Sequence, residues 1–168
     1  MKNLFLTCVA ILFVASQLYA QDEAELKAKF NEMNKEFSQM MVDGNHSGML
    51  KWYEDDAISM PSYQPMIKGI DALKKAQEMD KQMGTKITAF TLETTDVMPA
   101  GDYILEIGLY RISMVLPGMG AIDDNGKYMN VWEPQDDGSM KIKVDIWNTD
   151  LNPWTAMEGE HERMDKDE

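Results

Sequence analysis

Two carboxylates stand in otherwise apolar, strand-like stretches and are the residues best suited to acid/base chemistry. Glu106 and Asp145 each have branched apolar residues on both sides. An isolated carboxylate in such a place has a raised pKa or finds a partner. On neighbouring strands, the two would form an acid/base pair. Two alternatives remain open: Asp145 pairs with Lys143 or Lys141 on a solvated face, and Glu106 faces water.

Aromatic residues are candidates for the wall of a binding site. Five of them combine a large apolar surface with a polar edge: Tyr53, Tyr110, Tyr128, Trp132 and Trp147. Their hydroxyl and indole groups would orient a flat or cyclic ligand. Ordinary core packing is the alternative interpretation of the same residues.

Metal-binding residue types are present but lack a ligand pattern. The 16 methionines include soft thioethers suited to Cu(I). They are dispersed, however, and several fall on apolar helical stripes, so core packing explains them better. His46 and His161 have no ligand spacing, and Cys8 is the only cysteine. We therefore expect no metal and no cofactor.

The first 20 residues have the three parts of a secretory signal. Lys2 precedes an apolar run over residues 4–15, and Ala20 precedes polar residues. The apolar run is about half the roughly 20 residues of a membrane-spanning helix. We expect cleavage after Ala20, export to the periplasm or outside the cell, and no membrane attachment afterwards. An uncleaved anchor is the alternative, because Leu18 is bulky where a small residue is usual.

The remaining chain has the size of one domain. Removing the first 20 of 168 residues leaves 148, and we assign residues 21–156 to that domain. Residues 157–168 are mostly charged and are expected to form an acidic disordered tail. The net charge of −13 argues against nucleic acid as a partner.

Helical periodicity dominates the first half of the domain. Apolar residues at steps of three and four predict a helix over residues 23–43: Leu26, Phe30, Met33, Phe37, Met40 and Met41. A short second helix begins near Asn45 or Ser47 and ends at residues 54–56, before a brief strand at 57–60. Glycines bound a third helix over 69–84, with an apolar stripe of Ile70, Leu73, Ala76, Met79 and Met83.

After Gly84 the period changes to two. Four sequential antiparallel strands are predicted at 86–97, 103–115, 127–135 and 139–148, with turns at 99–102, 117–126 and 136–138. In the last strand, Met140, Ile142, Val144 and Ile146 alternate with Lys141, Lys143, Asp145 and Trp147. One sheet face would be packed and the other polar. The fold class is α+β, with helices over one face of a curved sheet.

This order of elements resembles the nuclear transport factor 2-like superfamily, in its SnoaL-like polyketide cyclase and ketosteroid isomerase-like branch. The similarity covers about residues 26–152 and is carried by the phrases 52–57, 126–132 and 143–148 and by Pro61 with Gly69. The resemblance implies a cone-shaped, curved antiparallel sheet of roughly four to six strands around the N-terminal helices. Its apolar interior would be lined by Phe37, Tyr53, Met60, Tyr110, Tyr128, Trp132 and Trp147.

The resemblance also shows which catalytic groups are missing. Ketosteroid isomerases use an aspartate base, with a tyrosine and a protonated aspartic acid that donate to an oxyanion. Here those positions fall on Pro61, Phe37 and Asn130 respectively. Proline cannot accept the proton and a phenyl ring cannot donate, so no recognised catalytic set remains. Limonene-epoxide-hydrolase-like relatives keep an aspartate on the last strand, and Asp145 matches it.

The leading expectation is an exported domain that binds a small apolar or aromatic molecule and forms a homodimer through the outer sheet face. The alternative is an isomerase or cyclase that uses Asp145 with Glu106 or a tyrosine. A third interpretation is a dimerisation module without a ligand.

Overall fold

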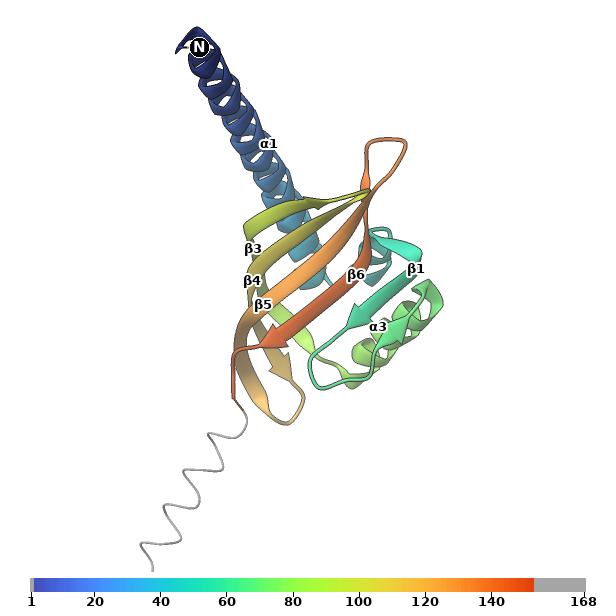
Figure 1. Cartoon of the computed structure of the whole chain (residues 1–168). Helices are drawn as coiled ribbons and strands as arrows, with labels where there is room; N and C mark the ends of the chain where they lie inside the picture. Colours follow the sequence, from blue (N-terminus) through green and yellow to red (C-terminus); the bar gives the residue numbers. More distant parts are fainter. Residues whose placement is uncertain (1, 153–168) are drawn as a thin grey trace, which may run out of the picture.

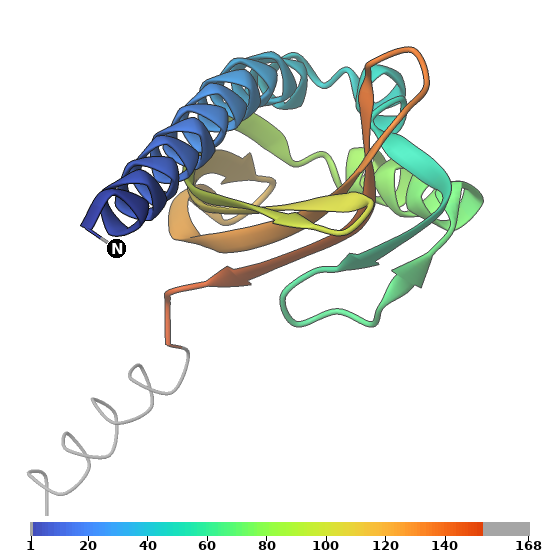
Figure 2. The ribbon, with the colours of Figure 1, turned by 45° about the horizontal axis from the view of Figure 1, so that its top comes forward.

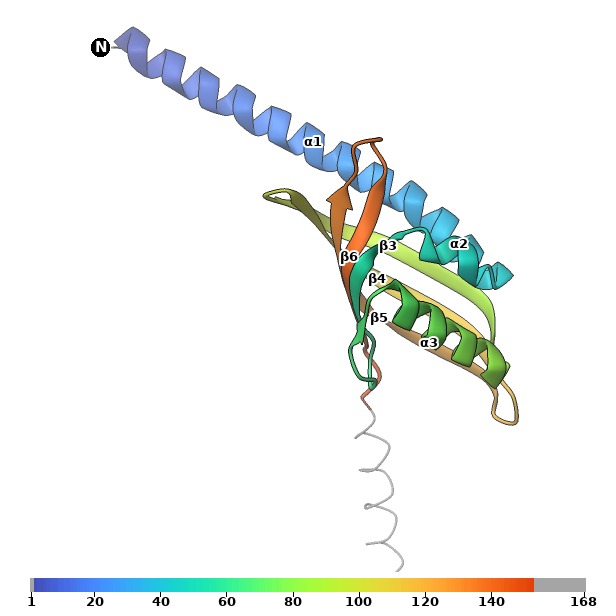
Figure 3. The same cartoon turned by 90° about the vertical axis from the view of Figure 1, so that its right-hand side faces the viewer.

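The helices lie in the first half of the chain and the four long strands follow them, as the change of period predicts. The computed structural model describes residues 2–152, with side chains from residue 23 onward. The elements are α1 (Lys2–Asp43), α2 (His46–Leu50), β1 (Tyr53–Met60), β2 (Ile67–Lys68), α3 (Ile70–Met83), β3 (Lys86–Ala100), β4 (Tyr103–Leu116), β5 (Gly120–Pro134) and β6 (Met140–Thr149). Figures 1, 2 and 3 show a curved sheet with the helices on one side of it. The predicted acidic tail, residues 157–168, lies outside the described residues.

The six strands have the order β2-β1-β6-β5-β4-β3. Strands β3 to β6 form an antiparallel meander, whereas β1 pairs with β6 in parallel. The predicted all-antiparallel sheet is therefore wrong at this pair. Because α3 and four strands separate β1 from β6 in the chain, the last strand can return beside β1 in the same direction, as Figure 1 shows.

Two predicted boundaries are also wrong. The segment 54–56 belongs to β1 rather than to the end of a helix, because ion pairs join Glu54 to Lys141 at 3.7 Å and Asp56 to Lys143 at 2.6 Å. The predicted loop 117–126 is mostly strand, since β5 already begins at Gly120. Its polar residues are paired across the hairpin with β4.

A β-bulge in β6 changes the predicted faces of the last strand. Ile142 pairs with Trp132, but Val144 pairs with the next residue of β5, Val131, so the strand contains one extra residue at Lys143. This extra residue reverses the alternation. Asp145 therefore shares the inner face with Ile142, instead of lying opposite it.

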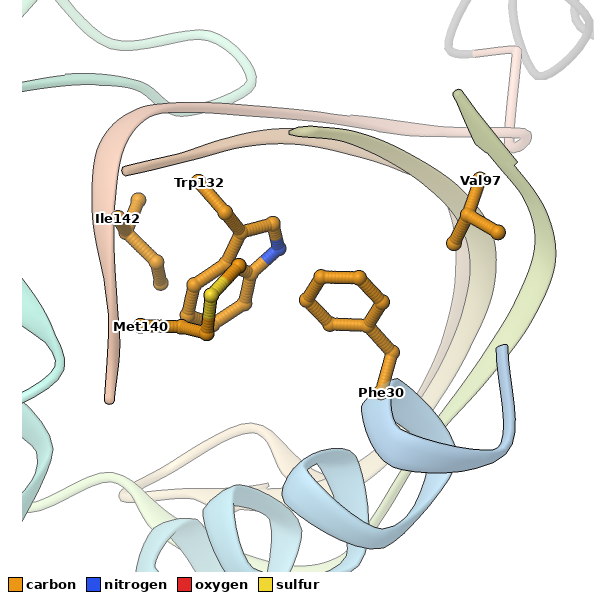
Figure 4. Close-up of a cluster of buried hydrophobic side chains, with 5 residues drawn as sticks. All are labelled: Phe30, Val97, Trp132, Met140 and Ile142. Carbon is orange, nitrogen blue, oxygen red and sulfur yellow. The ribbon is translucent and has the colours of Figure 1, made fainter. Parts of the chain in front are cut away.

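The hydrophobic core lies between α1 and strands β3, β5 and β6. Phe30 is fully buried and packs with Val97, Trp132, Met140 and Ile142, and Figure 4 shows its ring directed toward Trp132. The two ring centroids are 5.3 Å apart. Burial of such aromatic side chains contributes on the order of 2 kcal/mol each. This packing fixes α1 across the concave face of the sheet.

The inner face of α3 differs from the predicted apolar stripe. Leu73, Ala76, Gln77 and Asp80 line the cavity at helical spacing, with Asp80 at its exposed edge. Met79 and Met83 are exposed, so the predicted stripe is wrong in the second half of the helix. Two polar side chains thus occupy a face that ordinary packing would make apolar.

Two glycines make room for tyrosine rings on the concave face. Gly108 lies opposite Tyr128, and Gly126 lies opposite Tyr110. A Cβ on Gly108 would approach the Tyr128 ring, and one on Gly126 would approach the Tyr110 ring at 2.6 Å. Each ring therefore lies across a glycine of the neighbouring strand, which directs both hydroxyls along the inner face.

Candidate functional site

A cavity of about 320 Å³ lies between the concave face of the sheet and the three helices. Its volume is in the range of small-molecule sites. Six of the residues that the sequence suggested as lining do line it: Phe37, Tyr53, Tyr110, Tyr128, Trp132 and Trp147. Met60 is not among the lining residues, because it follows Ser59 in β1 and successive strand residues alternate in direction.

Glu106 forms the centre of a buried hydrogen-bond network beside this cavity. It is 0% exposed, so the interpretation that it faces water is wrong. Its Oε1 accepts hydrogen bonds from Asn34, Thr94 and Tyr128, each at 2.8 Å. Its Oε2 accepts from Trp132 at 2.8 Å and from Asn130 at 3.2 Å. Five donors thus surround one carboxylate.

The positions of four of these donors on β5 and α1 explain why they reach Glu106. Tyr128, Asn130 and Trp132 alternate along β5, so all three point to the same face. Asn130 lies directly opposite Glu106 in the register, with the other two on the diagonals. Asn34 comes from α1, one turn after Phe30. The tertiary packing of α1 therefore completes a network that the sheet begins.

Asp145 is the second buried carboxylate, and its surroundings differ. It is 8% exposed, lines the cavity, and its Oδ1 has no hydrogen-bond partner among the described residues. Burial raises the pKa of Asp145 to about 6, although the hydroxyls of Ser59 and Tyr53 favour its ionised form. The pKa of Tyr53 is raised well above its usual value, by burial and then by the Asp145 carboxylate.

The two lysines predicted to pair with Asp145 form ion pairs with other acidic residues. Lys143 contacts Asp56 and Glu133, and Lys141 contacts Glu54. The bulge at Lys143 accounts for this difference, because it turns Asp145 inward while both lysines bind acidic groups on neighbouring strands. The interpretation of Asp145 as a solvated, lysine-paired acid is therefore wrong.

A row of four buried polar residues crosses the inner face of the sheet. The register aligns Ser59 of β1 with Asp145 of β6, then Asn130 of β5, then Glu106 of β4. An acid/base pair would require the two carboxylates to lie on neighbouring strands. Glu106 and Asp145 do not. Strand β5 lies between them, which separates their backbones by about 10 Å.

Further polar residues of the cavity were not among the sequence candidates. Asn34 comes from α1, and Gln77 and Asp80 come from α3. Burial raises the pKa of Asp80, an effect that His46 partly opposes. The sequence did contain an indication of Asn34, because it follows Phe30 by four positions and therefore shares the apolar face of the helix.

Metal-binding groups do not gather in the described part of the chain. Residues 2–152 contain no cluster of three or more His, Cys, Asp or Glu side chains arranged to hold a metal ion. Within the same residues, no helix is both long enough and apolar enough to span a membrane.

Solved structures share this architecture at low sequence identity. A ketosteroid isomerase-like protein from Erwinia carotovora atroseptica SCRI1043 has a TM-score of 0.60 and 12% identity, covering 68% of this chain and 88% of that one. An NTF2-like protein with a cystatin-like fold from Novosphingobium aromaticivorans has a TM-score of 0.60 and 12% identity, covering 83% and 90%. This chain has the nuclear transport factor 2-like fold. The expected fold is confirmed.

A third neighbour was solved with a bound compound. A Catenulispora acidiphila protein in complex with S-DNPA has a TM-score of 0.61 and 11% identity, covering 76% of this chain and 96% of that one. No protein-family model matches the sequence, and no curated protein matches it. The likeness therefore establishes the nuclear transport factor 2-like fold alone.

Replacement of the central carboxylate of this nuclear transport factor 2-like cone tests its structural role. In Glu106→Gln, one oxygen becomes an NH₂ group that faces the donors of Asn130 and Trp132, or of the other three residues. We expect the free energy of unfolding in urea to fall by about 3 kcal/mol or more. Glu93→Gln, at an exposed position of β3, should change it by less than about 0.5 kcal/mol. Equal losses would contradict the role given to Glu106.

The raised pKa of Asp145 predicts how stability depends on pH. Burial raises this pKa from 3.8 to about 6, so between these values the folded chain binds more protons than the unfolded chain. Asp145 therefore makes the folded state less stable as the pH rises. A shift of this size corresponds to about 3 kcal/mol.

Asp145→Asn removes this titration. Relative to wild type, its free energy of unfolding should rise by about 3 kcal/mol between about pH 4 and about pH 7. The measurement is chemical denaturation across this range, with Asp96→Asn, at an exposed position of β3, as the control. A difference between variant and wild type that does not depend on pH would show that Asp145 titrates normally.

Proposed function

We propose that this protein is an exported binding protein for a small, mainly apolar molecule. The observation that carries the proposal is the cavity of about 320 Å³, whose wall includes Trp52, Trp132 and Trp147. Their rings provide a large apolar contact area, while a few polar groups remain to orient a ligand. Nuclear transport factor 2-like neighbours include a protein solved with a bound compound, which supports this use of the fold.

Export is supported by the sequence of the first 20 residues and by the position of the packed part of α1. The helix runs from Lys2 to Asp43, and Figure 3 shows its first half extending beyond the sheet. Among the described side chains of α1, which start at residue 23, Leu26 is the first to pack against the core, and the Lys27 ammonium donates to the Thr95 carbonyl at 2.8 Å. Cleavage after Ala20 would therefore leave these contacts in place.

A homodimer through the convex face of the sheet is part of the same proposal. Leu109 is 45% exposed on β4, and Met98 and Tyr103 are exposed on the β3–β4 hairpin. The helices lie on the opposite side of the sheet in Figures 2 and 3. The interface would be isologous, since each copy would use the same face.

One mass-spectrometric experiment tests these statements together. Protein purified from its own host without detergent should begin at Gln21, retain a small molecule that solvent extraction removes, and have the native mass of a dimer. Ala76→Trp, from the inner face of α3, should abolish the bound mass without unfolding the chain. Ala121→Trp, at an exposed position, should retain it. An empty wild-type cavity would contradict the binding function, and an intact N-terminus would contradict cleavage after Ala20.

A proton-transfer enzyme is the second candidate, and the pKa of Asp145 favours it. A carboxyl with a pKa of about 6, beside the Tyr53 hydroxyl, could act as a base. The expected result is deuterium exchange of 1-phenyl-2-propanone in D₂O faster than in buffer, followed by NMR. Asp145→Asn should abolish the added rate, and Asp96→Asn should keep it. Exchange no faster than in buffer would eliminate this candidate.

A further inference from the structure

The cavity presents hydrogen-bond acceptors that lack partners. Asp145 Oδ1 and Gln77 Oε1 are both buried, and neither has a hydrogen-bond partner among the described residues. Asp145 is more than nine-tenths buried. An unpaired buried acceptor costs free energy, and a bound donor would recover it. The cavity is therefore suited to a ligand that donates hydrogen bonds.

Five of the residues that line the same cavity already donate hydrogen bonds within the protein. Asn34, Tyr128, Asn130 and Trp132 all donate to Glu106. The Tyr110 hydroxyl donates to Asp124 at 3.0 Å. A ligand that brings only acceptors would compete with these internal hydrogen bonds. A ligand that brings donors would leave them intact.

The charge of the lining points to a cation. Asp80, Asp124 and Asp145 line the cavity, whereas none of the described residues lining it is a lysine, arginine or histidine. An anionic ligand would meet three carboxylates and no cationic side chain among the lining residues. The whole chain, at a net charge of −13, adds to the attraction for cations.

The wall supplies the remaining contacts. Trp52, Trp132 and Trp147 are the residues whose ring faces best stabilise a neighbouring cation. Phe37 and Phe90 extend the apolar surface. The ligand that matches all of these features has one positively charged, hydrogen-donating end and an apolar or aromatic body.

We propose that the cavity binds a small amine of this kind, whose ammonium group donates to Asp145. This inference rests on the proposed binding function and specifies the class of ligand. Asp145 is the specificity-determining residue, because it combines a charge, an unpartnered oxygen and a position on the cavity wall.

The pH dependence of binding follows from the groups around Asp145. Tyr53 and Ser59 contact it from β1, Asn130 lies opposite it on β5, and Asp80 of α3 lines the same cavity. None of these groups is cationic. Because its pKa is about 6, Asp145 is ionised above that pH and attracts the amine, whereas at lower pH it retains its own proton. Amine affinity should therefore rise with pH.

Three probes of similar size and different charge test the proposal. The probes are 2-phenylethylamine, 2-phenylethanol and phenylacetate, titrated against the folded protein by calorimetry and by the fluorescence of the tryptophans in the wall. Near pH 7.5 the amine should bind about tenfold or more tightly than the alcohol, and phenylacetate should bind most weakly. Near pH 5 the preference for the amine should fall severalfold.

Two variants identify the residue responsible. Asp145→Asn should weaken binding of 2-phenylethylamine about tenfold or more and leave 2-phenylethanol within about twofold. Asp96→Asn should change neither. Equal binding of amine and alcohol, tighter binding of phenylacetate, or an unchanged amine affinity in Asp145→Asn would overturn the proposal but leave the binding function standing. Binding of none of the probes would overturn both.

Discussion

One buried carboxylate organises the interior of this protein. Glu106 accepts hydrogen bonds from α1, β3 and β5 while it belongs to β4. Taking a carboxylate out of water is expensive unless its oxygens are fully paired, so these donors must be in place for the fold to form. The position of α1 across the sheet, the inward alternation of β5 and the orientation of the Tyr128 ring over Gly108 all serve this requirement.

This network determines what the cavity can offer to a ligand. Tyr128, Asn130 and Trp132 appear by residue type to be donors in a binding site. The Tyr128 hydroxyl, the Trp132 indole N–H and one hydrogen of the Asn130 amide are directed to Glu106, so Tyr128 and Trp132 present mainly their ring faces to the cavity. Asp145, two strands away, keeps an unpaired oxygen instead. The two acids therefore have different roles. Glu106 stabilises the fold, and Asp145 places a charged group with an unpaired oxygen on the cavity wall.

The sequence predicts the fold better than it predicts the site, for physical reasons. Helical and strand periodicity are local, so the first and third helices and the meander follow from spacing alone. The parallel pairing of β1 with β6 depends on contacts distant in sequence and was missed. Convergence of five donors on Glu106 also requires the assembled sheet and helix. Asn34 was present in the helical stripe, but only its tertiary neighbours explain it.

The bulge at Lys143 shows how one residue can change a functional interpretation. Simple alternation places Asp145 on the face opposite Ile142, among the lysines, where it would be an ordinary solvated acid. The extra residue in β6 places it opposite Asn130 inside the cavity.

Asn130 then limits the chemistry, because an amide at this position could in principle donate to a ligand oxyanion, as the acid of an isomerase does. Here its Nδ2 donates one hydrogen to Glu106 at 3.2 Å, which leaves one N–H and the carbonyl oxygen of the amide for the interior. The buried cavity atoms without a partner among the described residues are instead two acceptors, Asp145 Oδ1 and Gln77 Oε1.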